Sequence, residues 1–138
     1  MEKETDTLLK PEQILQNFAA GQGITVDQCS ADFCRLKCEI EPRHFNIHGI
    51  AHGGMIFTLL DASAGIAVRE AAAAGGEHRA VVTQCAGVHF LRPVSAGTVV
   101  AEGRIIRSGR STAVVRAELF NPDGKLAAFA DFEMFYVK

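Results

Sequence analysis

The segment from Gly53 to Ala74 constrains the fold of this chain more than any other. Its first sixteen residues, GGMIFTLLDASAGIAV, carry one charged side chain, Asp61. Apolar residues recur in it at intervals of three and four: Ile56, Leu59, Leu60, Ala64 and Ala67. This spacing, together with the length and the alanine content, predicts a helix over about 54–74 rather than a strand. Because that helix is nearly apolar, other elements must cover it.

The remaining segments predict a short N-terminal helix and six strands. Pro11 suits the first position of the helix, and Gly21 its end. Residues 33–41, FCRLKCEIE, alternate between apolar and charged side chains, which is the period of a strand with one wet face. Five further strands are expected at 24–29, 80–91, 98–107, 111–120 and 126–137. Short links such as NPDG leave no room for parallel crossovers, so we expect an α+β fold with a mostly antiparallel sheet wrapping the long helix.

Length and charge narrow the classes of function. The chain has 138 residues, of which 48% are hydrophobic, and this composition predicts one globular domain over 10–138 after a flexible segment, 1–9. The net charge is -2 and basic residues are scattered, which argues against nucleic-acid binding. The acidic N-terminus does not resemble a signal peptide, and no apolar run has the length of a membrane helix. We therefore expect a cytoplasmic protein.

The four cysteines lack a C-x-x-C pair. They are Cys29, Cys34, Cys38 and Cys85. Cys34, Cys38 and Cys85 fall in apolar-alternating segments, and the cysteines are predicted to be small buried side chains in a reducing compartment.

Asp61 is the first candidate for a catalytic group. The residues one turn away on its face, among them Phe57, Thr58 and Gly65, offer one hydroxyl and no cation. An ionised carboxylate in apolar surroundings costs several kcal/mol unless a distant group satisfies it, and Asp is a poor residue inside helices. The alternatives are a solvated helix face and a purely structural carboxylate.

A glycine-rich loop, RHFNIHGIAHGG, leads into the helix. It brings Asn46, His48 and His52 close to Gly53 and Gly54 at the helix start. First-turn N–H groups have no partner inside the helix and, with the helix dipole, favour a developing oxyanion. The loop therefore predicts a place where a carbonyl is polarised.

The spacing between the two groups has a consequence for assembly. Asp61 lies eight residues beyond Gly53, which is about 12 Å along a helix axis. A carbonyl held at Gly53 is then out of reach of Asp61 in the same chain, since reacting atoms must lie within roughly 3 Å. Two antiparallel helices related by a twofold axis would solve this, so we predict an obligate dimer with two composite sites.

One pattern resembles a known family. The run Asn46-x-His48-Gly49-x-x-His52-Gly53-Gly54-x-x-x-x-Leu59-x-Asp61, followed by FLRP at 90–93, is similar to the PaaI-like (phenylacetic acid degradation) branch of the hotdog-fold acyl-CoA thioesterases. The similarity covers roughly residues 20–137. It implies the hotdog fold, homodimers that often pair into dimers of dimers, and hydrolysis of an acyl-CoA to a carboxylic acid and coenzyme A, with aryl-acyl-CoA among the candidate substrates.

The resemblance also implies roles for residues. Asp61 matches the nucleophile or general base, Gly53 the backbone donor to the thioester carbonyl, and Asn46 the polar group near the carbonyl or water. Thr83 matches a hydroxyl that holds a water, and His52 either fixes the loop or transfers a proton. Coenzyme A would contact Phe90, Leu91, Arg92 and Pro93, and also Arg107, Ser108, Gly109, Arg110 and Ser111. Coenzyme A is part of the substrate, so no separate cofactor is expected.

A metal site and a non-catalytic binding role are the two alternatives to hydrolysis. His44, His48 and His52 recur at four-residue intervals, as metal ligands on a helix would, but the glycines and Pro42 argue against a helix there, so no metal is expected. A non-catalytic acyl-CoA sensor is the alternative function.

For the acyl group, Phe57, Val81 and His89 are the predicted pocket residues. The sequence determines neither the identity of the acyl group nor the choice between the anhydride and general-base routes.

Overall fold

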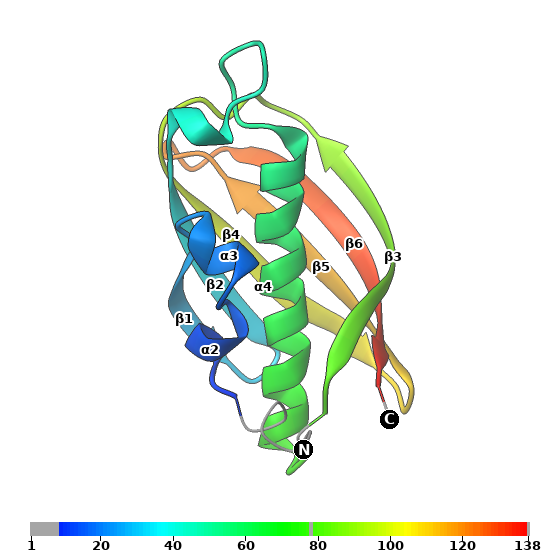
Figure 1. Ribbon diagram of the computed structural model, residues 1–138. Helices are drawn as coiled ribbons and strands as arrows, with labels where there is room; N and C mark the ends of the chain where they lie inside the picture. Colours follow the sequence, from blue (N-terminus) through cyan, green and yellow to red (C-terminus); the bar gives the residue numbers. More distant parts are fainter. Residues whose placement is uncertain (1–8, 78, 138) are drawn as a thin grey trace.

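In the computed structural model, which describes residues 9–77 and 79–137, six strands form an antiparallel sheet that curves around one long helix (Figure 1). The helix, α4, spans Gly53–Ala74. The strands are β1 (Thr25–Ser30), β2 (Phe33–Ile40), β3 (Val81–Phe90), β4 (Gly97–Ser108), β5 (Thr112–Phe120) and β6 (Leu126–Tyr136). The predicted fold is therefore confirmed, with every strand boundary within two residues. The predicted flexible segment lies almost wholly outside the described residues.

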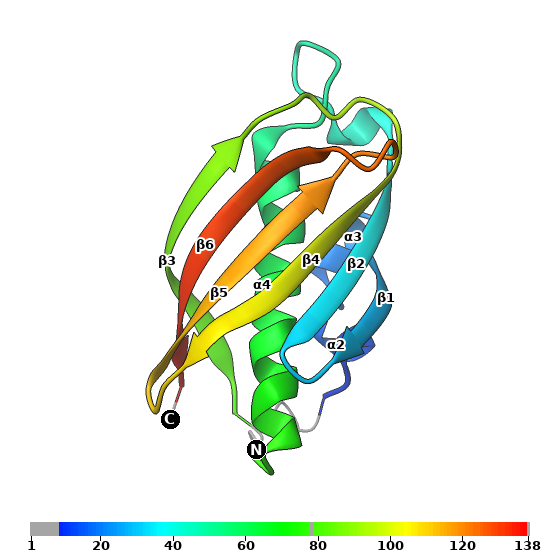
Figure 2. The ribbon, with the colours of Figure 1, turned by 180° about the vertical axis from the view of Figure 1, so that it is seen from behind.

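The strand order is β1-β2-β4-β5-β6-β3, and each neighbouring pair is antiparallel. A 3-10 helix at Pro42–His44 and a loop follow β2, and α4 then carries the chain across the concave face to the far side (Figure 2). For this reason β3 pairs with β6, the last strand, rather than with β2. Within the described sheet, β1 and β3 are the two edges.

The N-terminal helix starts and ends where predicted but is interrupted. It consists of α2 (Pro11–Ile14) and α3 (Phe18–Gly21). Asn17 between them has φ +73° and ψ -109°, which is outside the helical region and breaks the helix. Leu15 before the break is buried, whereas Phe18 after it is 66% exposed.

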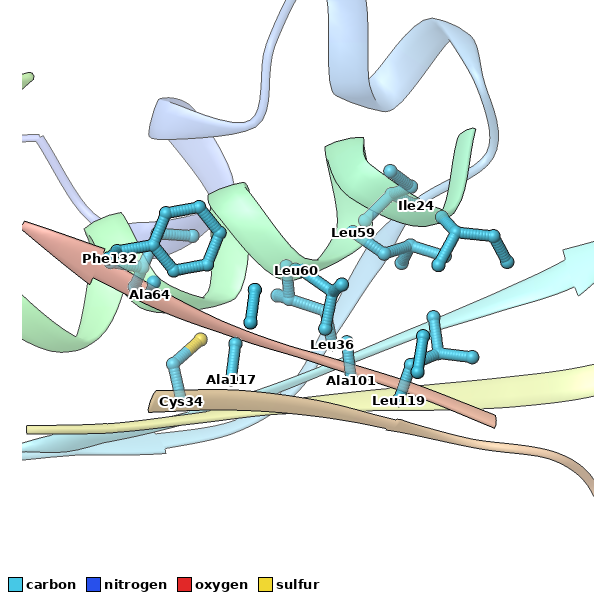
Figure 3. Packing of buried hydrophobic residues seen from close by; sticks show 14 of the residues in the cluster. Ile24, Cys34, Leu36, Leu59, Leu60, Ala64, Ala101, Ala117, Leu119 and Phe132 are labelled. Atoms are coloured by element: carbon cyan, nitrogen blue, oxygen red, sulfur yellow. The ribbon is translucent and has the colours of Figure 1, made fainter. Parts of the chain in front are cut away.

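Small residues on the concave face of the sheet let α4 lie close to it. Figure 3 shows Leu60 and Ala64 of α4 directed at the strands that carry Ala101 and Ala117. All four side chains are fully buried. Of the other apolar helix residues named above, Leu59 and Ala67 are also fully buried and Ile56 is 3% exposed. Burying a nearly apolar helix in this way is the main source of stability that the fold offers.

At Gly103 of β4 the backbones of sheet and helix approach each other closely. A Cβ atom there would lie 2.6 Å from the Ser63 carbonyl oxygen and 2.9 Å from the Ala64 nitrogen, both backbone atoms of α4. We expect Gly103→Ala to lower the free energy of unfolding by about 1–3 kcal/mol, because the whole helix must move to relieve the clash. Urea unfolding measures this. Gly21→Ala, where a Cβ meets nothing within 4 Å, is the control, and an equal effect of the two substitutions would contradict the close approach.

The cysteine prediction holds in part. Cys34 and Cys38 are buried, Cys29 is partly buried, and Cys85 is exposed. A β-bulge between Thr83 and Cys85 is the reason: it turns Cys85 to the convex face, opposite Glu133, whereas strict alternation would keep it on the face of Thr83. Among the described helices, none has the length and hydropathy needed to cross a bilayer.

Candidate active site

The loop before α4 presents backbone donors at the helix start. His52 is the N-cap residue: its Nδ1 accepts a hydrogen bond from the Gly54 N–H at 2.8 Å, and its carbonyl accepts those of Met55 and Ile56. Within residues 9–77 and 79–137, no acceptor is present for the N–H of Gly53. The cap thus satisfies its neighbours and leaves this one donor, at the positive end of the helix, available to a ligand.

Asn46 closes the loop on itself. Its Oδ1 accepts the N–H of His48 at 2.8 Å and that of Ile50 at 3.4 Å, and its backbone carbonyl accepts the N–H of Gly49. Gly49 has φ +77°, which favours glycine at this turn. Because the side-chain oxygen of Asn46 is used by the loop, the NH₂ group is the end of the side chain that remains for a ligand.

An open cavity of about 500 Å³ lies beside Gly53. It is lined by Asn46, Gly53 and the first predicted coenzyme A segment, residues 90–93. The Phe90 ring lies 3.5 Å from the position a Cβ of Gly53 would take. Arg92 donates from Nη1 to the Leu126 carbonyl at 2.6 Å, which anchors its guanidinium at the start of β6 and leaves further donors of the group for a ligand.

The candidate catalytic carboxylate has a partner that the sequence did not predict. The Thr83 hydroxyl donates a hydrogen bond directly to Oδ1 of Asp61, from β3 to the middle of α4. Thr83 was expected to hold a water; in the structure its hydroxyl also fixes the orientation of the carboxylate. Asp61 is partly buried, and among the described residues no basic side chain forms an ion pair with it. The alternation that places Val81 and Thr83 on the helix-facing side was the available signal for this contact.

Asp61 and Thr83 face a second cavity, of about 550 Å³. Its walls are mostly apolar and come from the N-terminal helices, α4, β3 and β6. They include Ile14, Leu15, Ala62, Gly65, Ile66, Val81, Val82 and Met134. Gly53 is not among the described lining residues of this cavity, nor Asp61 among those of the first. One chain therefore places the carboxylate and the backbone donor in separate cavities.

Several predicted residues do not meet in one chain. Residues 107–111 form the end of β4 and the β4–β5 turn, at the opposite end of the sheet from residues 90–93 (Figures 1 and 2). There the Ser108 hydroxyl lies 3.1 Å from the Tyr136 hydroxyl, and the Arg110 carbonyl accepts from Arg79. Arg107 and Ser111 are exposed beside them.

The three residues predicted for an acyl pocket do not line one cavity. Val81 lines the Asp61 cavity. Phe57 packs on Phe132 with ring centres 5.7 Å apart. His89 stacks on Phe129 at 4.7 Å, on the convex face, because the bulge at residue 84 reverses which side chains of β3 point inward.

The histidines of the loop have structural partners. His44 is buried, with Nδ1 accepting the Glu41 N–H at 3.0 Å and Nε2 at 2.9 Å from the Gln22 carbonyl. His52 caps α4, and His48 is exposed. In the part of the chain that the structure describes, no three His, Cys, Asp or Glu side chains are grouped as metal ligands. For His52 the geometry favours fixing the loop over proton transfer.

Known proteins resemble this chain in sequence. The profile of the thioesterase superfamily matches residues 48–128. A candidate esterase of Saccharolobus solfataricus is 31% identical over 92% of this chain and 79% of its own length. The acyl-coenzyme A thioesterase PaaI of Escherichia coli is 29% identical over 82% of this chain and 79% of its own.

Solved structures agree with the sequence relatives. The E. coli PaaI structure superposes with a TM-score of 0.82 at 24% identity, over 91% of this chain and 89% of its own. A Streptococcus mutans protein bound to acetyl CoA superposes with a TM-score of 0.75 at 27% identity, over 83% and 88%. By sequence and fold together, the chain belongs to the thioesterase superfamily, as a thioester hydrolase of the PaaI-like hotdog branch.

Proposed function

We propose that this protein hydrolyses acyl-CoA thioesters at two composite sites of a homodimer. The observation that carries the proposal is the placement of the Asp61–Thr83 pair in one cavity and the Gly53 N–H in another. Each chain then contributes its carboxylate to one site and its backbone donor to the other. A second copy in antiparallel orientation supplies the complementary group of each site. The acetyl CoA in the S. mutans relative supports an acyl-CoA as the ligand.

The exposed edge of β3 supports a dimer interface there. Its sequence, VVTQCAGVHF, has no Asp, Glu, Lys, Arg or Pro, the residues with which proteins usually protect an edge strand. Val82 is 51% exposed and Phe90 54% exposed. Pairing of this edge with its copy about a twofold axis would continue the sheet and bring the two α4 helices side by side in opposite directions. Association of two such dimers is part of the proposal.

The groups then act in sequence on the thioester. The carbonyl oxygen accepts the N–H of Gly53 of the partner subunit, with the Asn46 NH₂ group next to that N–H in the same cavity. Asp61, held by Thr83, either takes a proton from water as the water oxygen bonds to the carbonyl carbon, or attacks that carbon to form an anhydride that water then hydrolyses. In both routes the C–S bond breaks and the coenzyme A sulfur leaves and is protonated.

Coenzyme A would leave the site past residues 90–93, beside the Gly53 donor. Residues 107–111 lie at the far end of the same chain, so they can contact that coenzyme A only from another subunit. Arg107 and Arg110 are then the candidates for its phosphates, because guanidinium groups bind phosphate through paired hydrogen bonds.

Turnover by the wild-type protein tests the proposed function. A panel of acetyl-, hexanoyl-, decanoyl- and phenylacetyl-CoA is incubated with the protein, and free thiol is measured. We expect a kcat on the order of 1 s⁻¹ or higher for at least one member. Binding of the same compounds by calorimetry without any turnover would overturn the proposal and favour an acyl-CoA sensor.

The acyl group is expected to lie in the cavity of Asp61. Gly65 is one turn beyond Asp61 and lines this cavity, and a Cβ there comes no closer than 4.0 Å to Met134. Gly65→Leu should therefore fold normally and fill the cavity, lowering kcat/KM for decanoyl- or phenylacetyl-CoA by about 10- to 100-fold while acetyl-CoA is little affected. Gly65→Ala is the control. A uniform loss over the whole panel would argue that the acyl group lies elsewhere.

A further inference from the structure

Cys29 and Cys34 form a pair outside the proposed site. They are direct partners across the β1–β2 hairpin, where the pair Ser30–Phe33 closes a two-residue turn. Antiparallel pairs alternate, so the pair next to the closing one is of the non-hydrogen-bonded type, with Cα atoms about 4.5 Å apart and side chains close together. This separation lies within the range that a disulfide spans, roughly 4.4–6.8 Å.

The two thiols already interact and differ in environment. Partners in a sheet share a face, and here it is the concave one: Cys34 is fully buried and Cys29 partly exposed. The neighbouring Cys34 thiol lowers the pKa of Cys29, while the neighbouring Cys29 thiol and burial raise the pKa of Cys34. Cys29 is thus the more acidic of the two sulfurs and the one that an oxidant can reach, and the Cys34 sulfur lies buried beside it.

We propose that Cys29 and Cys34 are a site of reversible oxidation, at which hydrogen peroxide converts the two thiols into a disulfide. The Cys29 thiolate attacks one peroxide oxygen; an S–O bond forms, the O–O bond breaks, and hydroxide leaves. The Cys34 sulfur then attacks the Cys29 sulfur; the S–S bond forms, the S–O bond breaks, and water leaves with the Cys34 proton. In total, two thiols and one peroxide give one disulfide and two waters.

The other two cysteines lack this arrangement. Cys38 contacts the Gln22 and Glu39 carbonyls, each at 3.5 Å, and Cys85 lies opposite Glu133 on the convex face.

A disulfide between Cys29 and Cys34 would close a short loop that the hairpin already holds. It would therefore remove little chain entropy and add little stability, so thiols should reduce it readily. The site is independent of the proposed dimer and of the hydrolytic reaction.

Peroxide treatment of the whole, reduced protein tests the inference. After one molar equivalent of peroxide, the remaining thiols are alkylated in denaturant, and the masses of the tryptic peptides are measured by mass spectrometry. One peptide, residues 4–35, contains both cysteines of the pair. We expect the mass of this peptide to fall by two hydrogens and the peptide to carry no alkyl group, while Cys38 and Cys85 are alkylated. Treatment with dithiothreitol before alkylation should reverse the change. Cys85→Ser should leave the result unchanged.

A second variant separates a disulfide from oxidation of one sulfur. In Cys34→Ser the linked form cannot arise, so Cys29 should instead gain oxygen in a form that dithiothreitol restores only in part. If peroxide oxidises Cys85 in the wild-type protein while peptide 4–35 stays fully alkylated, the proposal is wrong. This measurement needs only the wild-type chain, so it stands even if the variant does not fold.

Discussion

Replacing Asp61 with asparagine is expected to lower kcat by about 1,000-fold or more, with little change in fold or in coenzyme A binding. Both routes of hydrolysis need an anionic oxygen at this position, as a nucleophile or as a base, and an amide supplies neither. Asparagine has the same shape and still accepts the hydrogen bond from the Thr83 hydroxyl, so the position of the side chain is kept. Thiol release measures kcat, and calorimetry measures binding of coenzyme A.

A matched substitution on the convex face controls for the change of charge. Asp131→Asn makes the same chemical change on β6, where the carboxylate lies 3.8 Å from Arg116 and lines neither cavity. It should leave kcat within about twofold, because exposed ion pairs contribute little. Retained turnover in Asp61→Asn would show that another group activates the water, and the assignment of Asp61 would then be wrong.

A dimer that combines two inactive chains is expected to recover about half of the wild-type activity, because one of its two sites is assembled from intact halves. The first chain carries Asp61→Asn. The second carries Gly53→Pro, which removes the N–H proposed to bind the carbonyl oxygen. In the mixed dimer, Asp61 of the second chain meets Gly53 of the first, whereas the other site carries both defects.

Gly53→Pro suits this test because the helix tolerates it. Proline is favoured at the first position of a helix, and His52 before it is already extended, with ψ 140°. Within the described residues the Gly53 N–H has no acceptor, so its loss breaks no internal bond. Gly53→Ala keeps the N–H and places its Cβ in ordinary contact with Phe90, which makes it the matched control.

The mixed dimer is isolated with two different affinity tags, and its turnover is compared with that of each variant alone. If both groups of a site came from one chain, every site in the mixed dimer would carry one defect and no activity would return. A dimer of Asp61→Asn with wild-type chains should have about half activity under either arrangement, which controls for the tags. Full activity of Gly53→Pro alone would exclude its N–H as the carbonyl donor.

Local patterns were enough to locate the secondary structure. The three- and four-residue spacing around Leu59 and Leu60 depends on neighbours along the chain, and so does the alternation of residues 33–41; both predicted the element that forms. The break at Asn17 was missed, since asparagine adopts a positive φ only in some contexts and Pro11 and Gly21 fitted one continuous helix.

Contacts between distant residues were harder to predict. Thr83 and Asp61 are 22 positions apart, and their hydrogen bond depends on where β3 lies against α4. The bulge before Cys85 has no clear mark in the sequence, yet it sends Cys85 and His89 to the convex face. A one-residue insertion reverses every later side chain of a strand, so errors of this kind propagate along β3.

The sequence by itself determined the helix, the six strands, the family resemblance and the eight-residue spacing between Gly53 and Asp61, because each of these depends on residues close together along the chain. Only the tertiary structure decided that Thr83 holds Asp61, that the carboxylate and the Gly53 donor face different cavities, and that Cys29 lies opposite Cys34. These depend on strand register, on a bulge and on the path of α4 across the sheet, which are settled by the packing of the whole core.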